Sequence, residues 1–91
     1  MSYIIRPTTK FEKDLKRAKT RGYDLSLLTA VLLKLVNGDK LPAKYKDHAL
    51  KGDYVGCREC HISPDWLLIY KISENQIYLF LMRTGTHSDL F

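Results

Sequence analysis

The sequence predicts an α+β domain in which a hairpin of two helices packs on one face of a small, mostly antiparallel sheet. Two apolar patterns with helical period occupy the N-terminal half of the chain, and three β-branched and aromatic runs occupy the C-terminal half. Short polar turns separate these segments, and the expected order is β-α-α-β-β-β. With 91 residues, 45% of them hydrophobic, the chain fits one domain over residues 1–91.

A short strand and a capped helix are expected at the start of the chain. The strand is the β-branched stretch at 3–6, which Pro7 closes. Thr9 and Glu12 have the T-x-x-E spacing of a capping box, which marks Thr9 as the helix cap. Gly22 is the natural stop of this helix. Its apolar stripe recurs at i, i+4 and i+7, as Phe11, Leu15 and Ala18.

A second helix is expected after a short turn, so that the two helices form a hairpin. Asp24 is a good N-cap residue, and Asn37-Gly38 supplies the stop signal. Leucines at helical spacing line one face between these ends, namely Leu25, Leu28, Leu32 and Leu35. This amphipathic pair needs a further layer, such as a sheet, to cover its apolar side.

Three strands are expected in the C-terminal half, at 54–62, 66–72 and 77–83. Residues 63–65 (SPD) and 73–75 (SEN) separate them, and both turns are short enough for hairpins. In the last two strands both alternating sets of side chains are largely apolar. These strands are therefore expected at the centre of the sheet, with helices over one face and other cover over the opposite face.

The chain is basic, with fifteen Lys and Arg against ten Asp and Glu, a net charge of +5 and a pI near 9.3. Such a charge suits a polyanion or an acidic protein as partner. The longest apolar runs, at 27–33 and 66–70, are far below the ~18 to 20 residues of a membrane span. Because the N-terminal stretch lacks an export pattern, we expect a cytoplasmic protein with reduced cysteines and no membrane contact.

Residues 57–61, CRECH, match the C-x-x-C-H signature of c-type haem attachment, with a redox dithiol and a zinc half-site as rival interpretations. In a strand, however, residues at this spacing point to opposite faces, with Cα atoms roughly 10 Å apart. A disulfide needs about 7 Å or less, and one haem or zinc cannot reach both sulfurs. We therefore expect no haem, no other cofactor, and a core position for Cys60 beside Ile62. The opposite face is expected to hold Cys57, Glu59 and His61.

All three histidines lie outside the helical half, as His48, His61 and His87. Asp65 and Arg83 also lie near ends of expected strands, where distant segments can meet. An unperturbed imidazole titrates near neutrality, so one His can act as general base and another as general acid. This suits RNA cleavage, in which a base deprotonates the 2′-hydroxyl, an acid protonates the 5′-oxygen and Arg83 binds the charged phosphate. A metal site is less favoured, since no close spacing such as H-x-x-x-H occurs.

Other residues are candidates for substrate binding. Trp66 is either a core residue or a ring that stacks an unpaired base beside His61, and Phe91 either packs back on the sheet or lines the site. Arg58 is carried to the same turn as His61. The first helix has a dense basic face that is either merely solvated or a docking surface for structured RNA, formed by Lys10, Lys13, Lys16 and Arg17.

Three stretches of the C-terminal half resemble the YafQ branch of the RelE/ParE superfamily, the toxins of bacterial type II toxin-antitoxin pairs. They are KDHALKG at 46–52, RECHISPDWLLIYK at 58–71 and RTGTHSDLF at 83–91. The pattern H-x-x-P-D-W followed by a terminal T-H-x-x-L-F is specific, and the expected element order is that of the RelE-like fold. The helical half is similar mainly in pattern and length, and Cys57 stands at a position that is commonly aromatic in relatives.

The resemblance implies an mRNA interferase, a ribosome-dependent endoribonuclease that cleaves translated mRNA in the A site and inhibits translation. We expect His87 to be the proton donor and His61 with Asp65 to be the base, and the pairing of acid and base among the histidines stays open. The resemblance implies that His48 also belongs to this acid-base group. It implies further that three residues support substrate placement and charge, namely Trp66, Arg83 and Phe91.

The resemblance also implies partners and leaves alternatives. An acidic cognate antitoxin similar to DinJ would neutralise the toxin and repress the operon with it, so that operator DNA is contacted only through the antitoxin. One alternative is a non-catalytic toxin of the ParE type, which inhibits gyrase by binding it. Another is a former toxin that serves only as co-repressor.

Overall fold

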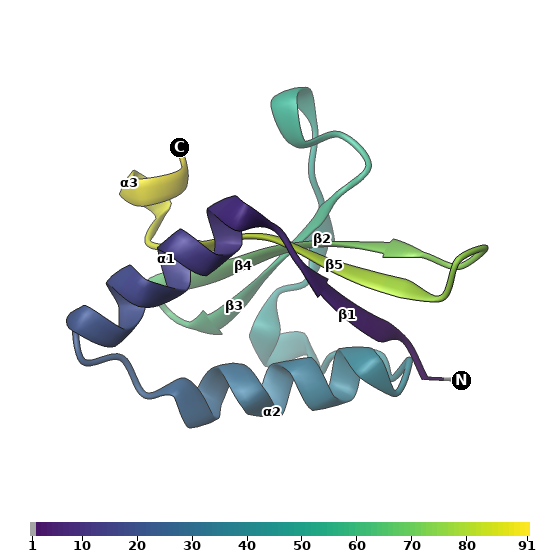
Figure 1. Cartoon of the computed structure of the whole chain (residues 1–91), viewed down its shortest axis with the longest axis horizontal. Coiled ribbons are helices and arrows are strands. Elements are labelled where there is room, and N and C mark those ends of the chain that lie inside the picture. The colour runs from purple at the N-terminus through teal and green to yellow at the C-terminus, as the bar shows by residue number, and fades with distance from the viewer. Residues whose placement is uncertain (1) are drawn as a thin grey trace.

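The computed structural model describes residues 2–91, which form a five-stranded sheet of order β1-β5-β4-β3-β2 with two long helices (Figure 1). The elements in chain order are β1 (Ile4–Pro7), α1 (Thr9–Thr20), α2 (Leu25–Val36), the 3-10 helix η1 (Ala43–Tyr45), β2 (His48–Ala49), the 3-10 helix η2 (Gly52–Tyr54), β3 (Arg58–Ser63), β4 (Trp66–Ser73), β5 (Tyr78–Gly85) and α3 (His87–Leu90). β1 pairs with β5 in parallel, and the other pairs are antiparallel. The predicted α+β class is confirmed.

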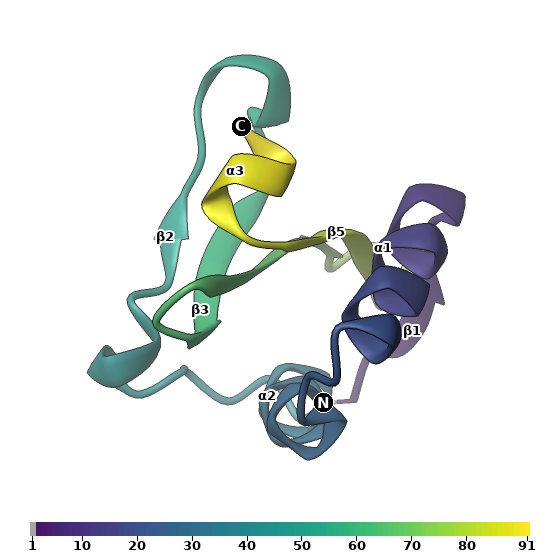
Figure 2. The same ribbon diagram turned by 90° about the vertical axis from the view of Figure 1, so that its left-hand side faces the viewer.

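Two apolar clusters cover opposite faces of the sheet. Figure 2 shows α2 on one side of the sheet and α3 on the other. The larger cluster, here called the helix-side core, contains Phe11, Ala18, Leu28, Val31, Leu35, Leu41, Cys60, Ile62, Trp66, Leu68, Tyr70, Leu79 and Leu81. The smaller one, the open-side cluster, contains Cys57, Leu67, Ile69 and Leu90. Alternate residues of β4 therefore enter different clusters, which confirms the expectation of cover on both faces.

The helix ends agree with the predicted signals except at the first cap. Asp24 caps α2 through its side chain, and Gly22 and Gly38 follow the two helices with positive φ. The cap of α1 is Thr8 rather than Thr9, and the third helical residue is then Phe11 rather than Glu12, so the predicted capping box does not form. The Thr8 hydroxyl accepts from the N–H of Phe11. The same hydroxyl contacts backbone carbonyls of β5, so tertiary contacts favour Thr8 as the cap.

The predicted strand at 54–62 is too long at its start. Residues 52–54 form η2, a turn follows at Gly56, where φ is +89°, and β3 begins only at Arg58. The preceding segment, expected to be a loop, contributes the two-residue strand β2, which pairs with β3. Glycine tolerates the positive φ that ends the strand at this position. The segment before it therefore turns back and pairs with β3 as β2.

Two further features shape the site. α3 is a single turn of helix after β5, in a segment for which the sequence predicted no element. The register of β4 and β5 shifts between Ile69 and Tyr70, so that Ile69 pairs with Arg83 and Tyr70 with Leu81. Within residues 2–91, no helix has the length and apolar character needed to cross a membrane.

Candidate active site

Side chains from four strands form one row on the open side of the sheet. Directly opposed residues of an antiparallel sheet point to the same face. The register from β2 to β5 aligns His48, Glu59, Ile69 and Arg83. A parallel row, two residues along β3, is formed by His61, Leu67 and Gly85. The sheet thus brings together two of the predicted histidines and the predicted arginine, and Gly85 leads into α3.

Glu59 lies between two imidazoles of this site. Its Oε1 is 3.5 Å from Nε2 of His48 and 4.0 Å from Nε2 of His61. The side chain is buried, and its Oε2 has no hydrogen-bond partner within residues 2–91. Unsatisfied buried polar groups are rare in folded proteins, and a catalytic role is one established reason for them. Glu59 is therefore a candidate catalytic residue.

The orientation of His48 suits proton transfer. Its Nδ1 is 2.8 Å from the carbonyl oxygen of Lys46. Because a carbonyl can only accept, Nδ1 carries the proton of this hydrogen bond, and Nε2 is left to face Glu59. Lys46 presents its carbonyl from a left-handed backbone conformation, with φ of 50°. The pair formed by His48 Nε2 and the Glu59 carboxylate can thus take up and release one proton, as a general base must.

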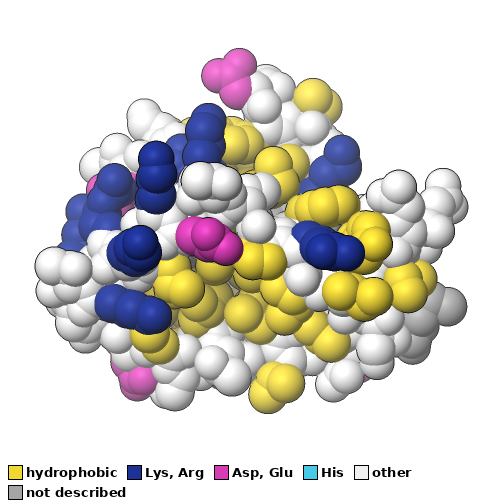
Figure 3. All heavy atoms as spheres, in the orientation of Figure 1, with side chains coloured by type: hydrophobic (Ala, Val, Ile, Leu, Met, Phe, Trp, Pro, Cys, Tyr) yellow, Lys and Arg dark blue, Asp and Glu magenta, His cyan; other side chains and the backbone are white. Residues whose placement is uncertain are grey.

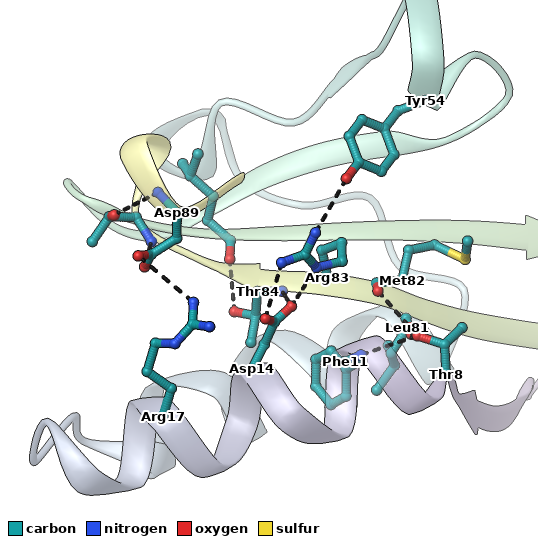
Figure 4. Close-up of polar contacts among 12 residues, drawn as sticks. Thr8, Phe11, Asp14, Arg17, Tyr54, Leu81, Met82, Arg83, Thr84 and Asp89 are labelled. Atoms are coloured by element: carbon teal, nitrogen blue, oxygen red, sulfur yellow. Dashed lines mark hydrogen bonds and ion pairs between the residues drawn. The ribbon is translucent and has the colours of Figure 1, made fainter. Parts of the chain in front are cut away.

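Arg83 occupies the β5 end of the row and is held by two side chains (Figure 4). Its Nε donates to Oδ2 of Asp14 at 2.6 Å and its Nη2 to Oδ1 at 3.1 Å. Its Nη1 makes a longer bond, 3.5 Å, to the hydroxyl of Tyr54. The hydrogen bonds that Arg83 donates to Asp14 raise the pKa of Arg83 above its ordinary value, so the guanidinium keeps its charge. With 20% of its side chain exposed, Arg83 can still meet a phosphate.

α3 and its C-cap residue place His87 and Phe91 on the same side of the sheet. The Thr86 hydroxyl accepts from the N–H of Asp89, and the Asp89 carboxylate accepts from the N–H of Thr86 at 2.8 Å. Arg21, the C-cap residue of α1, donates to the same carboxylate at 2.6 Å and 3.0 Å. These bonds, with the one from Thr86, lower the pKa of Asp89. The rings of His87 and Phe91, both exposed, lie 5.0 Å apart. α1 thereby anchors the short helix that presents His87.

A groove of about 780 Å³ extends from this region between α1, α3 and the segment around η2. Its lining includes Lys10, Lys51, Tyr54 and Phe91. The rings of Tyr54 and Phe91 lie 5.8 Å apart in an edge-on arrangement. Because the Tyr54 hydroxyl also contacts Arg83, the groove adjoins the row. Asp53 and Asp89 also line the groove, so its ammonium groups stand beside carboxylates. The two rings are the part of the lining that suits stacking of RNA bases.

The turn between β3 and β4 places Asp65 and Trp66 apart from the row. Trp66 is buried in the helix-side core, where its ring lies 4.9 Å from that of Tyr23 and its Nε1 donates to Thr84 Oγ1 at 2.8 Å. Asp65 is exposed and lines a pocket beside Tyr23. Within the part of the chain that the structure describes, Glu59 and not Asp65 is the carboxylate at ion-pair distance from His61.

Arg58 lies on the face opposite the row, because it alternates with Glu59 along β3. Its Nη2 is 3.2 Å from Oδ2 of Asp47, and Oδ1 of Asp47 accepts a 2.6 Å hydrogen bond from the Tyr70 hydroxyl. The bond to Asp47 raises the pKa of Arg58. The sheet therefore separates this arginine from His61, although the two residues are close in sequence.

The basic face of α1 is on the surface. Figure 3 shows Lys and Arg side chains gathered over this helix. Every member is exposed, which fits the predicted docking surface of Lys10, Lys13, Lys16 and Arg17. Arg17 also lies 3.7 Å from Asp89, so one end of the surface touches the anchor of α3.

The two cysteines are free and buried in separate clusters, as the alternation along the strand predicts. Cys60 is fully buried in the helix-side core, and burial raises the pKa of its thiol to about 12. Cys57 packs with Leu67 and Ile69 on the open side. Both cysteines therefore act as small apolar residues.

Two residues of the site were missed by the assignment of roles from sequence, although signals for both existed. Alternation along the strand placed Glu59 on the same face as His61. A carboxylate two residues from a histidine on one face is a possible ion-pair partner, and this signal was not used. Asp14 falls on the apolar stripe of α1, between Phe11 and Ala18. A charged residue on an apolar stripe signals a buried polar partner, but the identity of that partner depends on the packing of α1 against β5.

Comparison with known proteins identifies relatives along the whole chain. A family described as the bacterial toxin of type II toxin-antitoxin system, YafQ, matches residues 3–91. The mRNA interferase toxin YafQ of Escherichia coli K12 is 43% identical over 83 residues, which are 90% of this chain and 88% of that protein. The crystal structure of the E. coli DinJ-YafQ toxin-antitoxin complex superposes with a TM-score of 0.90 at 40% identity, covering 100% of this chain and 99% of that one.

A metal-bound toxin from Helicobacter pylori is also similar, with a TM-score of 0.91 and 47% identity over 100% of both chains. Zinc in proteins lies about 2.0 to 2.2 Å from its imidazole and carboxylate ligands and commonly takes four ligands. Within residues 2–91 no group of three or more His, Cys, Asp or Glu side chains is arranged to hold a metal ion.

Proposed function

The chain belongs to the YafQ family of bacterial type II toxins, and from this premise we propose that it is a ribosome-dependent endoribonuclease that cleaves translated mRNA. The observation that carries the proposal is the position of the Glu59 carboxylate, which lies between two imidazoles in the same row as Arg83. This arrangement supplies a base and a phosphate-binding cation on one open face. A toxin that acted only by binding a protein would need neither.

The base is proposed to be the group formed by Glu59, His48 and His61. It takes the proton of the 2′-hydroxyl next to the scissile phosphate, and the 2′-oxygen then attacks phosphorus. The bond from phosphorus to the 5′-oxygen breaks, and His87 donates a proton to that oxygen. The products are a 2′,3′-cyclic phosphate and a free 5′-hydroxyl. Glu59 takes the place that the sequence analysis gave to Asp65.

Arg83 is proposed to bind the phosphate oxygens while negative charge develops on them. A guanidinium that cannot lose its proton gives fixed stabilisation, and such stabilisation is commonly the largest contribution of an active site. Phe91 and Tyr54 are proposed to hold a base next to the cleaved bond in the groove that adjoins Arg83. The proposed docking surface of α1 binds ribosomal RNA phosphates, so activity should weaken as salt is added.

The E. coli relative forms a complex with DinJ, and we propose a similar acidic antitoxin for this basic chain. The antitoxin would neutralise the toxin in the cytoplasm and repress the operon with it, contacting the operator DNA itself. Two observations would support the pairing: a short acidic protein encoded by the neighbouring gene, and co-purification of that protein with this toxin.

Cleavage of mRNA on programmed ribosomes tests the proposal. The wild-type protein should produce in-frame cuts in a defined mRNA only when ribosomes are present, with 2′,3′-cyclic phosphate ends. His87→Ala should abolish the cuts while its thermal melt matches that of wild type. Cuts of equal rate in His87→Ala would remove His87 from the mechanism. Inhibition of gyrase without mRNA cleavage would replace the proposal with a ParE-type function.

A further inference from the structure

Asp14 is a charged residue in an apolar setting. It belongs to the stripe of α1 that packs against the sheet, beside Phe11 and Ala18, and only 4% of it is exposed. Burial of an unpaired carboxylate is very unfavourable, so a side chain at this position must have compensating partners.

The partners of Asp14 all belong to β5 (Figure 4). Its Oδ2 accepts from Arg83 Nε at 2.6 Å and from the Thr84 backbone N–H at 3.1 Å. Its Oδ1 accepts from Arg83 Nη2 at 3.1 Å. One carboxylate oxygen therefore binds the backbone of β5, and both oxygens accept hydrogen bonds from the guanidinium.

The geometry of this pair leaves Arg83 usable. All the nitrogens of a guanidinium, Nε, Nη1 and Nη2, carry N–H donors. Asp14 takes the side-on pair, on Nε and Nη2, and Tyr54 contacts Nη1. The remaining N–H groups lie on the Nη1 and Nη2 nitrogens, which are the ones that bind phosphate in a fork. Asp14 and Tyr54 thus hold the plane of the guanidinium without occupying every donor.

Stability alone is a poor reason for such a pair. Replacement of a buried ion pair by well-packed apolar residues is often neutral or stabilising, because removing two charges from water is costly. What a bidentate pair supplies is geometry, because it restricts a flexible side chain to one position. Reactions that depend on a placed charge lose rate when that charge moves by as little as ~1 Å.

We propose that Asp14 is the positioning residue for Arg83, holding the guanidinium of the proposed active site so that its free N–H groups meet the scissile phosphate. Asp14 itself touches no substrate and acts only through Arg83. This inference rests on the proposed function. It gives α1 a second task besides docking, because the helix that carries the basic surface also orients the cation of the site.

Single-turnover cleavage on programmed ribosomes gives the first test. Asp14→Asn should lower the rate of cleavage roughly 10- to 100-fold, while the ribosome concentration for half-maximal rate stays unchanged because the docking surface is intact. Glu12→Gln is the matched control, since it removes an exposed carboxylate from the same helix and should leave both quantities unchanged. A purely structural role would lower the amount of folded protein without changing the rate per folded molecule.

Chemical rescue separates positioning from stability. Arg83→Ala should regain part of its activity when guanidinium is added at millimolar concentration, because Asp14 can hold the added ion in the vacated place. The double variant Asp14→Asn with Arg83→Ala removes both charges, so it is expected to fold, and it should show no rescue.

Equal rescue in both backgrounds, or an unchanged cleavage rate in folded Asp14→Asn, would overturn this inference while wild-type cleavage upheld the proposed function. Absence of ribosome-dependent cleavage by the wild-type protein would overturn the proposed function, and this inference with it.

Discussion

The two faces of β3 differ in how completely their groups are satisfied. Glu59 and Cys60 are consecutive and both buried. Cys60 lies in the helix-side core among apolar neighbours. Glu59 has one oxygen shared by two imidazoles and another that finds no hydrogen-bond partner among residues 2–91. The helix side thus supplies stability, and the open side retains polar groups that folding alone does not require. Proteins commonly accept such a cost at functional sites.

The largest contrast is expected between neighbouring substitutions on these faces. Glu59→Gln should lower mRNA cleavage by at least about 100-fold. Its melting temperature should stay equal or rise, because an unsatisfied buried carboxylate oxygen costs free energy. Cys60→Ala should do the reverse, lowering the free energy of unfolding by about 1 kcal/mol and leaving the cleavage rate per folded molecule unchanged. Thermal melts and single-turnover assays on both variants check this, and an active Glu59→Gln would contradict the role of the open face.

The two arginines that were predicted to bind substrate provide the next contrast. Arg83→Ala should reduce cleavage by roughly 100-fold, because a fixed charge facing the phosphate is lost. Arg58→Ala should leave cleavage close to wild type, since the sheet separates Arg58 from the histidines. Cleavage rates of the Arg83→Ala and Arg58→Ala variants, measured at several salt concentrations, check this difference. If Arg58→Ala were as inactive as Arg83→Ala, substrate would have to contact both faces.

A smaller effect is expected at the junction of β5 and α3. A Cβ on Gly85 would lie 2.9 Å from Oδ2 and 3.0 Å from Cβ of Asp89. Gly85→Ala should therefore push Asp89 away from Thr86 and Arg21, at a cost of about 1 to 3 kcal/mol, and loosen the helix that carries His87. Amide hydrogen exchange should speed up in residues 86–91 more than in β4. Unchanged exchange there would show that α3 is held by other contacts.

A still smaller effect is expected in how the stability of this junction depends on pH. The pKa of Asp89 is lowered from its ordinary value of 3.8 by Arg21 and by the Thr86 N–H. Its ionised form therefore adds stability above that value, and this stability is lost as the pH falls below it. Arg21→Gln should reduce the melting temperature at pH 6, and its difference from wild type should shrink towards pH 2.5. Lys19→Gln, with the same charge change on α1, should show no such narrowing.

The smallest effect is expected for thiol chemistry. Because burial raises the pKa of Cys60 to about 12, iodoacetamide at pH 8 should not modify this residue until the protein unfolds. Cys57→Ser with Cys60→Ala should retain toxicity, whereas His61→Ala should lose it. Rapid alkylation of Cys60 in the native protein, measured by mass spectrometry, would show that the helix-side core opens.

Most of the fold followed from local patterns, and the parts that did not are those that depend on contacts between distant segments. The leucine spacing of α2 and the alternation of β4 predicted which side chains are buried. The pairing of His48 with Glu59 did not follow, because a strand of two residues has no periodicity of its own. Thr8 displaced Thr9 as a cap because carbonyls of β5 lie beside it.

The candidate site was predictable in its residue types more than in its groupings. His48, His61 and Arg83 share the open side of the sheet, which the sequence suggests in outline because strand ends and opposed residues can be located from it. Trp66 and Asp65 follow each other in the chain but reach different environments, one buried and one exposed. Only the β-turn geometry and the packing of Tyr23 decide this, and neither is encoded in a short motif.

The bond between Thr8 and the β5 carbonyl of Leu81 joins positions 73 apart in the chain. Contacts at such separation close long loops and make folding slow relative to helical proteins of the same size. Asp14 and Arg83 are joined over a similar separation of 69 positions, so the guanidinium is held only when α1 lies against β5. The position of the proposed phosphate-binding cation therefore depends on contact between the two ends of the chain and not on any one local segment.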